Sequence, residues 1–143
     1  MGDRCSLEMT VRKQDRDRVI EVMGEPEFEN DPQSTLGPNL LDLSWAQKNH
    51  RGASDRLQLT NEGIPFVGWH GPGDNYGEFV FASCDRVMKE CPKLTIVDRA
   101  EPVVVVRQDH EGLLVLDPQM ATLASDYWDQ YNLAIKALKG EAS

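Results

Sequence analysis

The stretch that organises this chain runs from Gly63 to Phe81 and reads GIPFVGWHGPGDNYGEFVF. It contains an apolar run at 64–67, a loop rich in Gly and Pro, and a second apolar run at 79–81. Because Pro65 has no backbone N–H to donate, the first run predicts a strand that lies at a sheet edge or bulges. The second run is apolar on both faces, which is typical of a strand covered on both sides. A sheet is therefore expected at the centre of the fold.

Alternation of apolar and polar residues predicts more strands on either side of this stretch. Near the N-terminus and again around Trp45, every second residue is apolar, which is the period of a half-buried strand. The polar members of these two runs point to the opposite face and include Glu8, Thr10, Asp42 and Ser44. Runs rich in Val predict later strands, and a turn at 109–112 joins the last two in a hairpin. The predicted strands cover 5–11, 41–45, 57–60, 64–67, 79–82, 94–97, 103–106 and 113–116.

Two helices are expected, one near each end of the chain. The first covers 16–23 and ends at Gly24, because glycine adopts a left-handed conformation at little cost. The second follows Asp117 as N-cap, begins at Pro118, carries apolar residues at steps of three and four, and ends at Gly140. The residues expected to cap the first helix are Gln14 and Asp15.

Three segments carry weaker patterns. Residues 25–38 combine acidic residues with prolines, which predicts a mobile acidic loop with Phe28 as an anchor to the core. Residues 47–56 are polar and turn-forming. Residues 85–91 fit a short helical turn whose apolar residues face inward.

The pattern of elements predicts the fold class. Strands outnumber helices, and hairpin-sized gaps separate most of them. Parallel strands would need helical crossovers between the later strands, and the pattern predicts none there. The sequence therefore predicts one α+β domain over 1–143. We expect a mostly antiparallel, curved sheet of about five to eight strands, with the long C-terminal helix packed on one face.

Composition and charge restrict the classes of function. A chain of 143 residues with a net charge of −9 repels phosphate backbones, which argues against a general nucleic-acid binder. Three cysteines cannot all pair in disulfides, so free thiols in a reducing compartment are expected. No run has the length and apolarity of a signal peptide or a membrane span. The protein is thus expected to be cytoplasmic and to have no membrane partner.

The most enzyme-like feature is the pair of His70 and Asp74, which could act as a base and its orienting carboxylate. No nucleophile motif, phosphate loop or metal-binding spacing accompanies this pair. Cys84 has an acidic neighbour, Asp85, which raises rather than lowers the pKa of a thiol. The sequence leaves open whether these groups converge in the fold. It predicts no catalytic residue, no metal and no cofactor.

A recognition surface is better supported by the residue types. Aromatic side chains dominate the energetics of interfaces. Trp69 and Tyr76 flank the Gly-rich loop, and Trp128 lies at the margin of the apolar stripe of the C-terminal helix. Acidic residues recur at every second position from 25 to 31, which suits a basic partner. The predicted partner-binding residues are Trp69, Asp74, Tyr76, Glu25, Glu27, Glu29, Asp31 and Trp128.

These features favour a small, acidic, non-enzymatic protein that inhibits or modulates a protein partner with a basic surface. This general type is common among inhibitors, immunity proteins and phage-encoded antagonists that act in host–pathogen interactions. The analogy is at the level of the class only. Two alternatives stay open. One is a small enzyme or small-ligand binder with a pocket at the Gly-rich loop 68–77. The other is an oligomeric structural subunit, such as a homodimer paired through the strand at Pro65 or the face around Trp128.

Overall fold

The computed structural model describes residues 4–30, 37–49, 52–72, 78–92, 106–108, 114–116 and 118–140. Its elements follow the chain in the order β1 (Arg4–Arg12), the 3-10 helix η1 (Lys13–Asp15), α1 (Arg16–Met23), β2 (Phe28–Asn30), β3 (Leu40–Asn49), α2 (Ala53–Asn61), β4 (Phe66–His70), β5 (Phe79–Cys84), β6 (Val87–Pro92), β7 (Val106–Gln108), β8 (Leu114–Leu116) and α3 (Pro118–Lys139).

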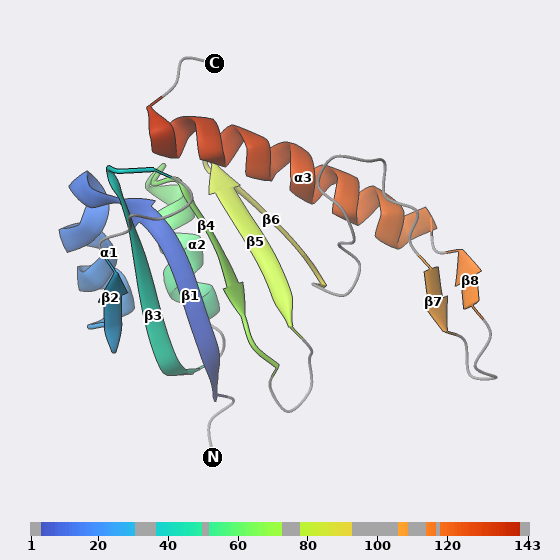
Figure 1. Ribbon diagram of the computed structural model, residues 1–143, viewed down its shortest axis with the longest axis horizontal. Helices are drawn as coiled ribbons and strands as arrows, with labels where there is room; N and C mark the ends of the chain where they lie inside the picture. Colours follow the sequence, from blue (N-terminus) through green and yellow to red (C-terminus); the bar gives the residue numbers. More distant parts are fainter. Residues whose placement is uncertain are drawn as a thin grey trace.

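Six of the strands form one sheet in the order β2-β3-β1-β4-β5-β6, and every neighbouring pair in it is antiparallel. The long helix α3 crosses this sheet obliquely (Figure 1). Strands β7 and β8 pair separately, as an antiparallel two-stranded sheet. The predicted α+β class, the antiparallel sheet and the C-terminal helix packed on it are confirmed.

One face of the sheet is covered by α1 and α2. Side chains alternate between the two faces of a strand, so every second residue of β1 points toward these helices. Leu7 is fully buried there, together with Val19 of α1 and Leu59 of α2. Phe66 and Phe81 extend the cluster across β4 and β5, with ring centroids 5.8 Å apart in an edge-to-face contact. This face holds the larger core of the protein.

The opposite face is covered by α3, but only over part of its width. Tyr127, Ala134 and Leu138 of α3 are buried against Val67 and Ala82 of the central strands. The contacts of α3 lie mainly on β5 and β6, fewer on β4, and reach β1 only at the margin. The half of the sheet formed by β2, β3 and β1 therefore has one face packed against helices and one face that α3 leaves uncovered.

The strand predicted at 57–60 is wrong, because this segment belongs to α2. The two leucines that suggested alternation have different environments: Leu59 is fully buried and Leu57 is 53% exposed. The buried face of α2 consists of Arg56, Leu59 and Thr60, at the spacing of three and four that neighbours on a helix share. Because one of the buried positions is an arginine, the helical spacing cannot be recognised from the apolar residues alone.

The prediction that the strand at Pro65 lies at a sheet edge or bulges is wrong, because the strand lies inside the sheet and its register is continuous. β4 begins at Phe66, directly after the proline, and pairs with β1 on one side and β5 on the other. The helical turn predicted after β5 is wrong as well. Asp85 and Arg86 form a tight turn there, and β6 follows it with Val87 44% exposed.

The predicted acidic loop contains a strand that the sequence analysis missed. Residues 28–30 form β2, which pairs with β3 at the edge of the sheet. The expectation that Phe28 anchors the segment to the core is wrong, since this side chain is 73% exposed. Phe28 lies opposite Ser44 in the register, on the face that α3 leaves uncovered.

The strands predicted at 5–11, 41–45 and 79–82 are confirmed as β1, β3 and β5. The predicted C-terminal hairpin is confirmed by the pairing of β7 with β8. Residues 94–97 and 109–112, and most of 103–106, lie outside the described residues.

Both predicted helices are confirmed. Gly24 ends α1 with a φ of 93°, and Gly140 follows α3 with a φ of 72°. Asp15 stands at the N-cap position of α1 but makes no capping hydrogen bond. It accepts one from Arg12 instead, at 2.7 Å. No helix in the described part of the chain combines the length and the apolarity needed to cross a membrane.

Candidate functional site

A groove of about 700 Å³ lies on the sheet face that carries α3, beside this helix. Its floor is the uncovered part of β1 and β3 with the adjoining part of β4, one side is formed by Tyr127 and Tyr131 of α3, and β2 forms the rim. The groove exists because α3 packs over β4, β5 and β6 and stops short of the other half of the sheet.

Two rows of cross-strand partners run along the floor and continue under α3. Residues that lie opposite one another in an antiparallel sheet share a face and have Cβ atoms about 5 Å apart. The first row is Phe28, Ser44, Glu8, Trp69 and Val80, and the second is Asn30, Asp42, Thr10, Val67 and Ala82. The polar residues of the two N-terminal strands therefore meet aromatic and apolar residues of β4 and β5 on one surface.

The charge of the groove is negative. Glu8 is exposed, and Asp42 is half-buried and accepts a hydrogen bond from the Thr10 hydroxyl at 2.6 Å. Glu29 also lines the rim, but it lies opposite Leu43 in the register, so its carboxylate is on the α1 face and pairs with Arg16 there. No Lys or Arg is among the described residues that line the groove. A cation that entered would therefore meet carboxylates without competition from these residues.

Aromatic side chains give the groove its apolar surface. Trp69 is half-buried, and its indole N–H donates to the Glu78 carboxylate at 3.1 Å. Tyr127 and Tyr131 have ring centroids 5.9 Å apart, and Trp128 packs edge-to-face against both, at 5.0 Å and 5.1 Å. This cluster holds the tyrosines in place, and aromatic rings with a polar tip suit a wet interface.

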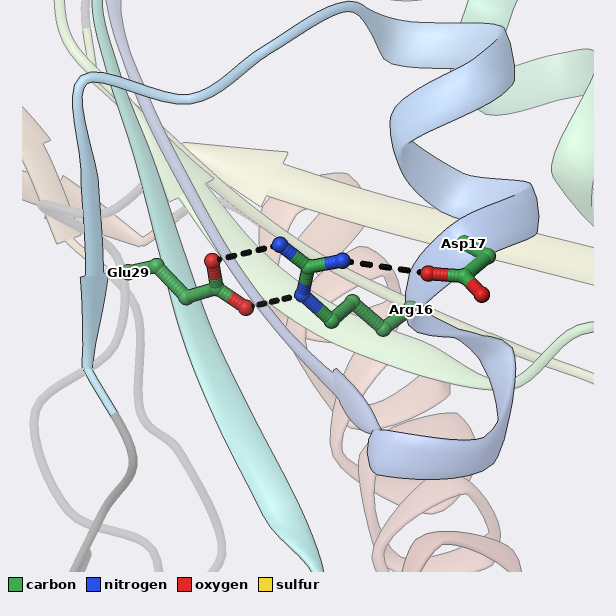
Figure 2. A network of polar contacts seen from close by, with 3 residues as sticks. All are labelled: Arg16, Asp17 and Glu29. Carbon is green, nitrogen blue, oxygen red and sulfur yellow. Dashed lines mark hydrogen bonds and ion pairs between the residues drawn. The ribbon is translucent and has the colours of Figure 1, made fainter.

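The rim strand β2 is tied to α1 by an ion pair. Figure 2 shows the Arg16 guanidinium forming a fork with the Glu29 carboxylate, with Nη2 2.9 Å from Oε2. A third guanidinium nitrogen of Arg16 donates to Asp17 at 3.0 Å. The bond to Arg16 lowers the pKa of Glu29 below its usual range, because it stabilises the charged carboxylate. The exposed rim is thus held by its backbone pairing with β3 and by this ion pair.

Of the predicted partner-binding residues, the structure places Trp69 in the groove and Glu29 at its rim, with the Glu29 carboxylate turned to Arg16 on the α1 face. Glu27 lies close by, and its carboxylate accepts a hydrogen bond from the Ala46 backbone N–H at 2.5 Å. Glu25 is exposed between α1 and β2. Trp128 is half-buried behind the two tyrosines and does not line the groove. Asp31, Asp74 and Tyr76 lie outside the described residues.

Of the groups considered for catalysis, His70 and Cys84 lie on opposite faces of the sheet, and Asp74 lies outside the described residues. His70 is fully buried in β4, and its ring stacks on the Phe79 ring with the centroids 5.4 Å apart. It lies opposite Leu7, on the face covered by α1 and α2. Cys84 belongs to the cluster under α3, on the other face. Burial, and then the charge of Asp85, raise the pKa of the Cys84 thiol, as the acidic neighbour predicted.

The sequence analysis missed Glu8, Asp42, Phe28 and the two tyrosines of α3 as site residues. The sequence did contain one indication, since the polar residues of the two alternating runs predict a face of the sheet that contacts solvent. What the pattern does not contain is the register that aligns these residues with Trp69. The self-pairing surface expected near Pro65 is also excluded, because β4 has neighbours on both sides.

The three free cysteines are all buried, and no group of three or more metal-ligating side chains occurs in the described ranges. The chain matches no protein-family model, no curated protein sequence and no solved structure. The argument for function consequently comes from the groove itself.

Proposed function

We propose that this protein is a non-enzymatic binding protein that inhibits or modulates a protein partner by holding a basic segment of that partner in the groove. The observation that carries the proposal is the floor, where Glu8 lies opposite Trp69 and Asp42 lies in the neighbouring row, on a sheet face that α3 leaves uncovered. Charge complementarity would orient the partner, and the net charge of −9 would speed its approach. A basic segment of the partner that is bound in the groove could not bind elsewhere at the same time, which would inhibit or modulate the partner.

The groove is favoured over the acidic segment as the main contact. Within that segment, Glu27 is bonded to the backbone of β3 and Glu29 to Arg16. Of the carboxylates described there, Glu25 is the one that has no such internal bond. An isolated exposed carboxylate contributes little to binding, whereas the groove combines charge with buried aromatic surface.

The proposal is tested with two variants of equal net charge. In the first, Glu8 and Asp42 are both replaced by Lys. In the second, Asp126 and Asp129, which are exposed on α3, are replaced in the same way. Each protein is used to retain partners from host lysate at low salt, after circular dichroism and thermal melting have confirmed its fold.

The groove variant is expected to lose the partner that the parent and the α3 variant retain. The complex should also weaken as salt rises from ~0.05 M to ~0.5 M, because screening shortens the range of the attraction. Equal retention of the same proteins by the groove variant would contradict the proposal.

A small-ligand binder is the second candidate function. A volume of about 700 Å³ lies within the range of small-molecule sites, and the groove includes Gly68 and Trp69, where the Gly-rich loop begins. A thermal-shift screen would support this candidate if a compound stabilises the parent and leaves the Glu8→Lys/Asp42→Lys variant unchanged.

A further inference from the structure

The groove floor presents side chains to an incoming chain, because its backbone groups are used within the sheet. Residues 8–10 of β1 pair with 42–44 of β3 on one side and with 67–69 of β4 on the other. Residues 42–44 pair in turn with 28–30 of β2. An extended segment laid on this face would lose water from its own backbone N–H and C=O groups and find no backbone partners for them, which costs free energy.

An α-helix avoids this cost. Its backbone groups bond to one another within the helix, and only its side chains approach the neighbouring surface. The protein covers its own sheet in this way, with α1 and α2 on one face and α3 on part of the other. A helical segment could therefore lie on the floor without leaving buried backbone groups unpaired.

The uncovered half of the sheet has about the width of one helix. Neighbouring strands lie about 4.8 Å apart, so the three spacings from β2 to β4 span about 14 Å. A helix with its side chains is about 10–12 Å across, and helices that pack side by side have axes about 8–10 Å apart. Figure 1 shows α3 as a single helix on this face, and one of its turns, with Tyr127 and Tyr131, forms the side of the groove. A second helix would fit beside it.

The side chains of the floor and rim suit a helix that is both basic and apolar. Glu8 and Asp42 lie diagonally across β1 and β3, with Cβ atoms about 7 Å apart. Residues three or four positions apart on a helix have Cβ atoms about 5–6 Å apart. Two basic side chains one turn apart can therefore reach both carboxylates. Phe28, which is 73% exposed at the rim, offers an apolar contact beside them.

We propose that the groove takes its basic segment as an amphipathic α-helix, packed beside α3 on the half of the sheet formed by β2, β3 and β1. The inference rests on the proposed function, in which the groove holds a basic segment of a protein partner, and it specifies the conformation of that segment. The basic residues of the helix would face Glu8 and Asp42, and its apolar residues would contact Phe28.

Two synthetic peptides of equal charge test the inference by calorimetric titration at low salt. The first has about 15 residues, the length at which isolated helices become stable, with Leu at steps of three and four and Lys on both flanks of this stripe. The second differs only in a central Ala→Pro change, which breaks the helix. Both are titrated into the parent, the Glu8→Lys/Asp42→Lys variant and, as a control of equal net charge, the Asp126→Lys/Asp129→Lys variant. Far-UV circular dichroism of each mixture measures the helix gained on binding.

The parent is expected to bind the helical peptide about tenfold more tightly than the Pro peptide, with a gain of helical signal. The Asp126→Lys/Asp129→Lys variant should keep this preference, and the Glu8→Lys/Asp42→Lys variant should not bind. Equal affinity for both peptides that depends on the groove would overturn the inference and leave the proposed function standing. Binding that survives in the groove variant would overturn it too. If the parent binds neither peptide, the inference is overturned, while retention of a partner from lysate still tests the proposed function separately.

Discussion

The side-chain amide nitrogen of Gln130 on α3 lies 2.8 Å from the backbone carbonyl oxygen of Cys84, at the end of β5. The same nitrogen donates its second proton to the carbonyl oxygen of Val87, at 2.7 Å. The two carbonyls flank the turn at Asp85 and Arg86, which adopt φ angles of 53° and 65°. One buried side chain thus joins the helix to both ends of the β5–β6 turn.

Replacing Gln130 by Ala should lower the free energy of unfolding by about 1–3 kcal/mol, because two carbonyl groups beneath α3 lose their donor. Urea unfolding followed by circular dichroism measures the change. Gln58→Ala provides the control, since Gln58 is exposed and bonds only Glu62, at 3.2 Å. Its effect should stay within about 0.5 kcal/mol. Equal effects of the two substitutions would refute this role of Gln130.

Gly68 is required by its packing against the backbone of β1 and against Phe81 in the core under α1 and α2. A Cβ at this position would lie 2.3 Å from the carbonyl oxygen of Glu8 and 2.6 Å from the ring of Phe81. Gly68→Ala should therefore lower the free energy of unfolding by about 2 kcal/mol or more, because the backbone of β1 must shift. At Gly71 the nearest atom would be 3.5 Å away. Gly71→Ala should cost much less, and a reversed order in thermal melting would contradict the geometry.

The ion pair between Arg16 and Glu29 should control how often β2 separates from β3. Glu29→Gln is expected to raise amide hydrogen exchange at 27–30 by about two- to fivefold, the range that exposed pairs contribute. Glu21→Gln is the matched control, because Glu21 pairs with Arg18 within α1 and does not contact β2. Unchanged exchange at 27–30 in Glu29→Gln would show that the pairing with β3 alone holds the strand.

The same pair predicts the pH dependence of β2. The folded pKa of Glu29 is depressed, so its contribution is complete above the usual pKa range of glutamate. It is lost as the pH falls through the depressed value. Protection of 27–30, corrected for intrinsic exchange rates, should decline over that lower window in the parent. In Glu29→Gln it should not follow this titration, and a decline of the same size there would refute the assignment.

Cys84 should react slowly with iodoacetamide in the folded protein. Its raised pKa, due first to burial and then to the charge of Asp85, leaves little thiolate at pH ~8. Asp85→Asn removes the charge and keeps a residue that tolerates positive φ. The alkylation rate, measured by mass spectrometry, should rise about two- to threefold. An unchanged rate would mean that access alone limits the reaction, and Asp129→Asn serves as the control.

The sequence predicted the fold class because the long alternations around Leu7 and Leu43 and the stripe of α3 each have one strong period. It failed at α2, where Arg56 occupies a buried helical position that an apolar pattern does not recognise. It also failed at the turn of Asp85 and Arg86, because Arg86 adopts a positive φ without being a typical turn residue and no glycine or proline marks the turn.

The candidate site was less predictable than the fold. Trp69 was identified by residue type, and Glu29 by the spacing of the acidic residues. The partnership of Glu8 with Trp69 depends on which strands are neighbours and in which register. These are long-range properties that no local pattern contains. The burial of His70 was not predicted either, because the nearby glycines are typical of a loop, whereas His70 belongs to a strand.

In the half of the sheet that α3 leaves uncovered, the residues needed for folding and the residues of the groove lie on opposite faces of the same strands. Positions on the buried side of β1 and β3 are fixed by the core, whereas Glu8 and Ser44 on the other side contribute little to folding. Substitutions at these positions should alter what the protein recognises at almost no cost in stability. The groove floor is therefore a surface on which new specificities can arise by a few changes, by natural variation or by selection in the laboratory.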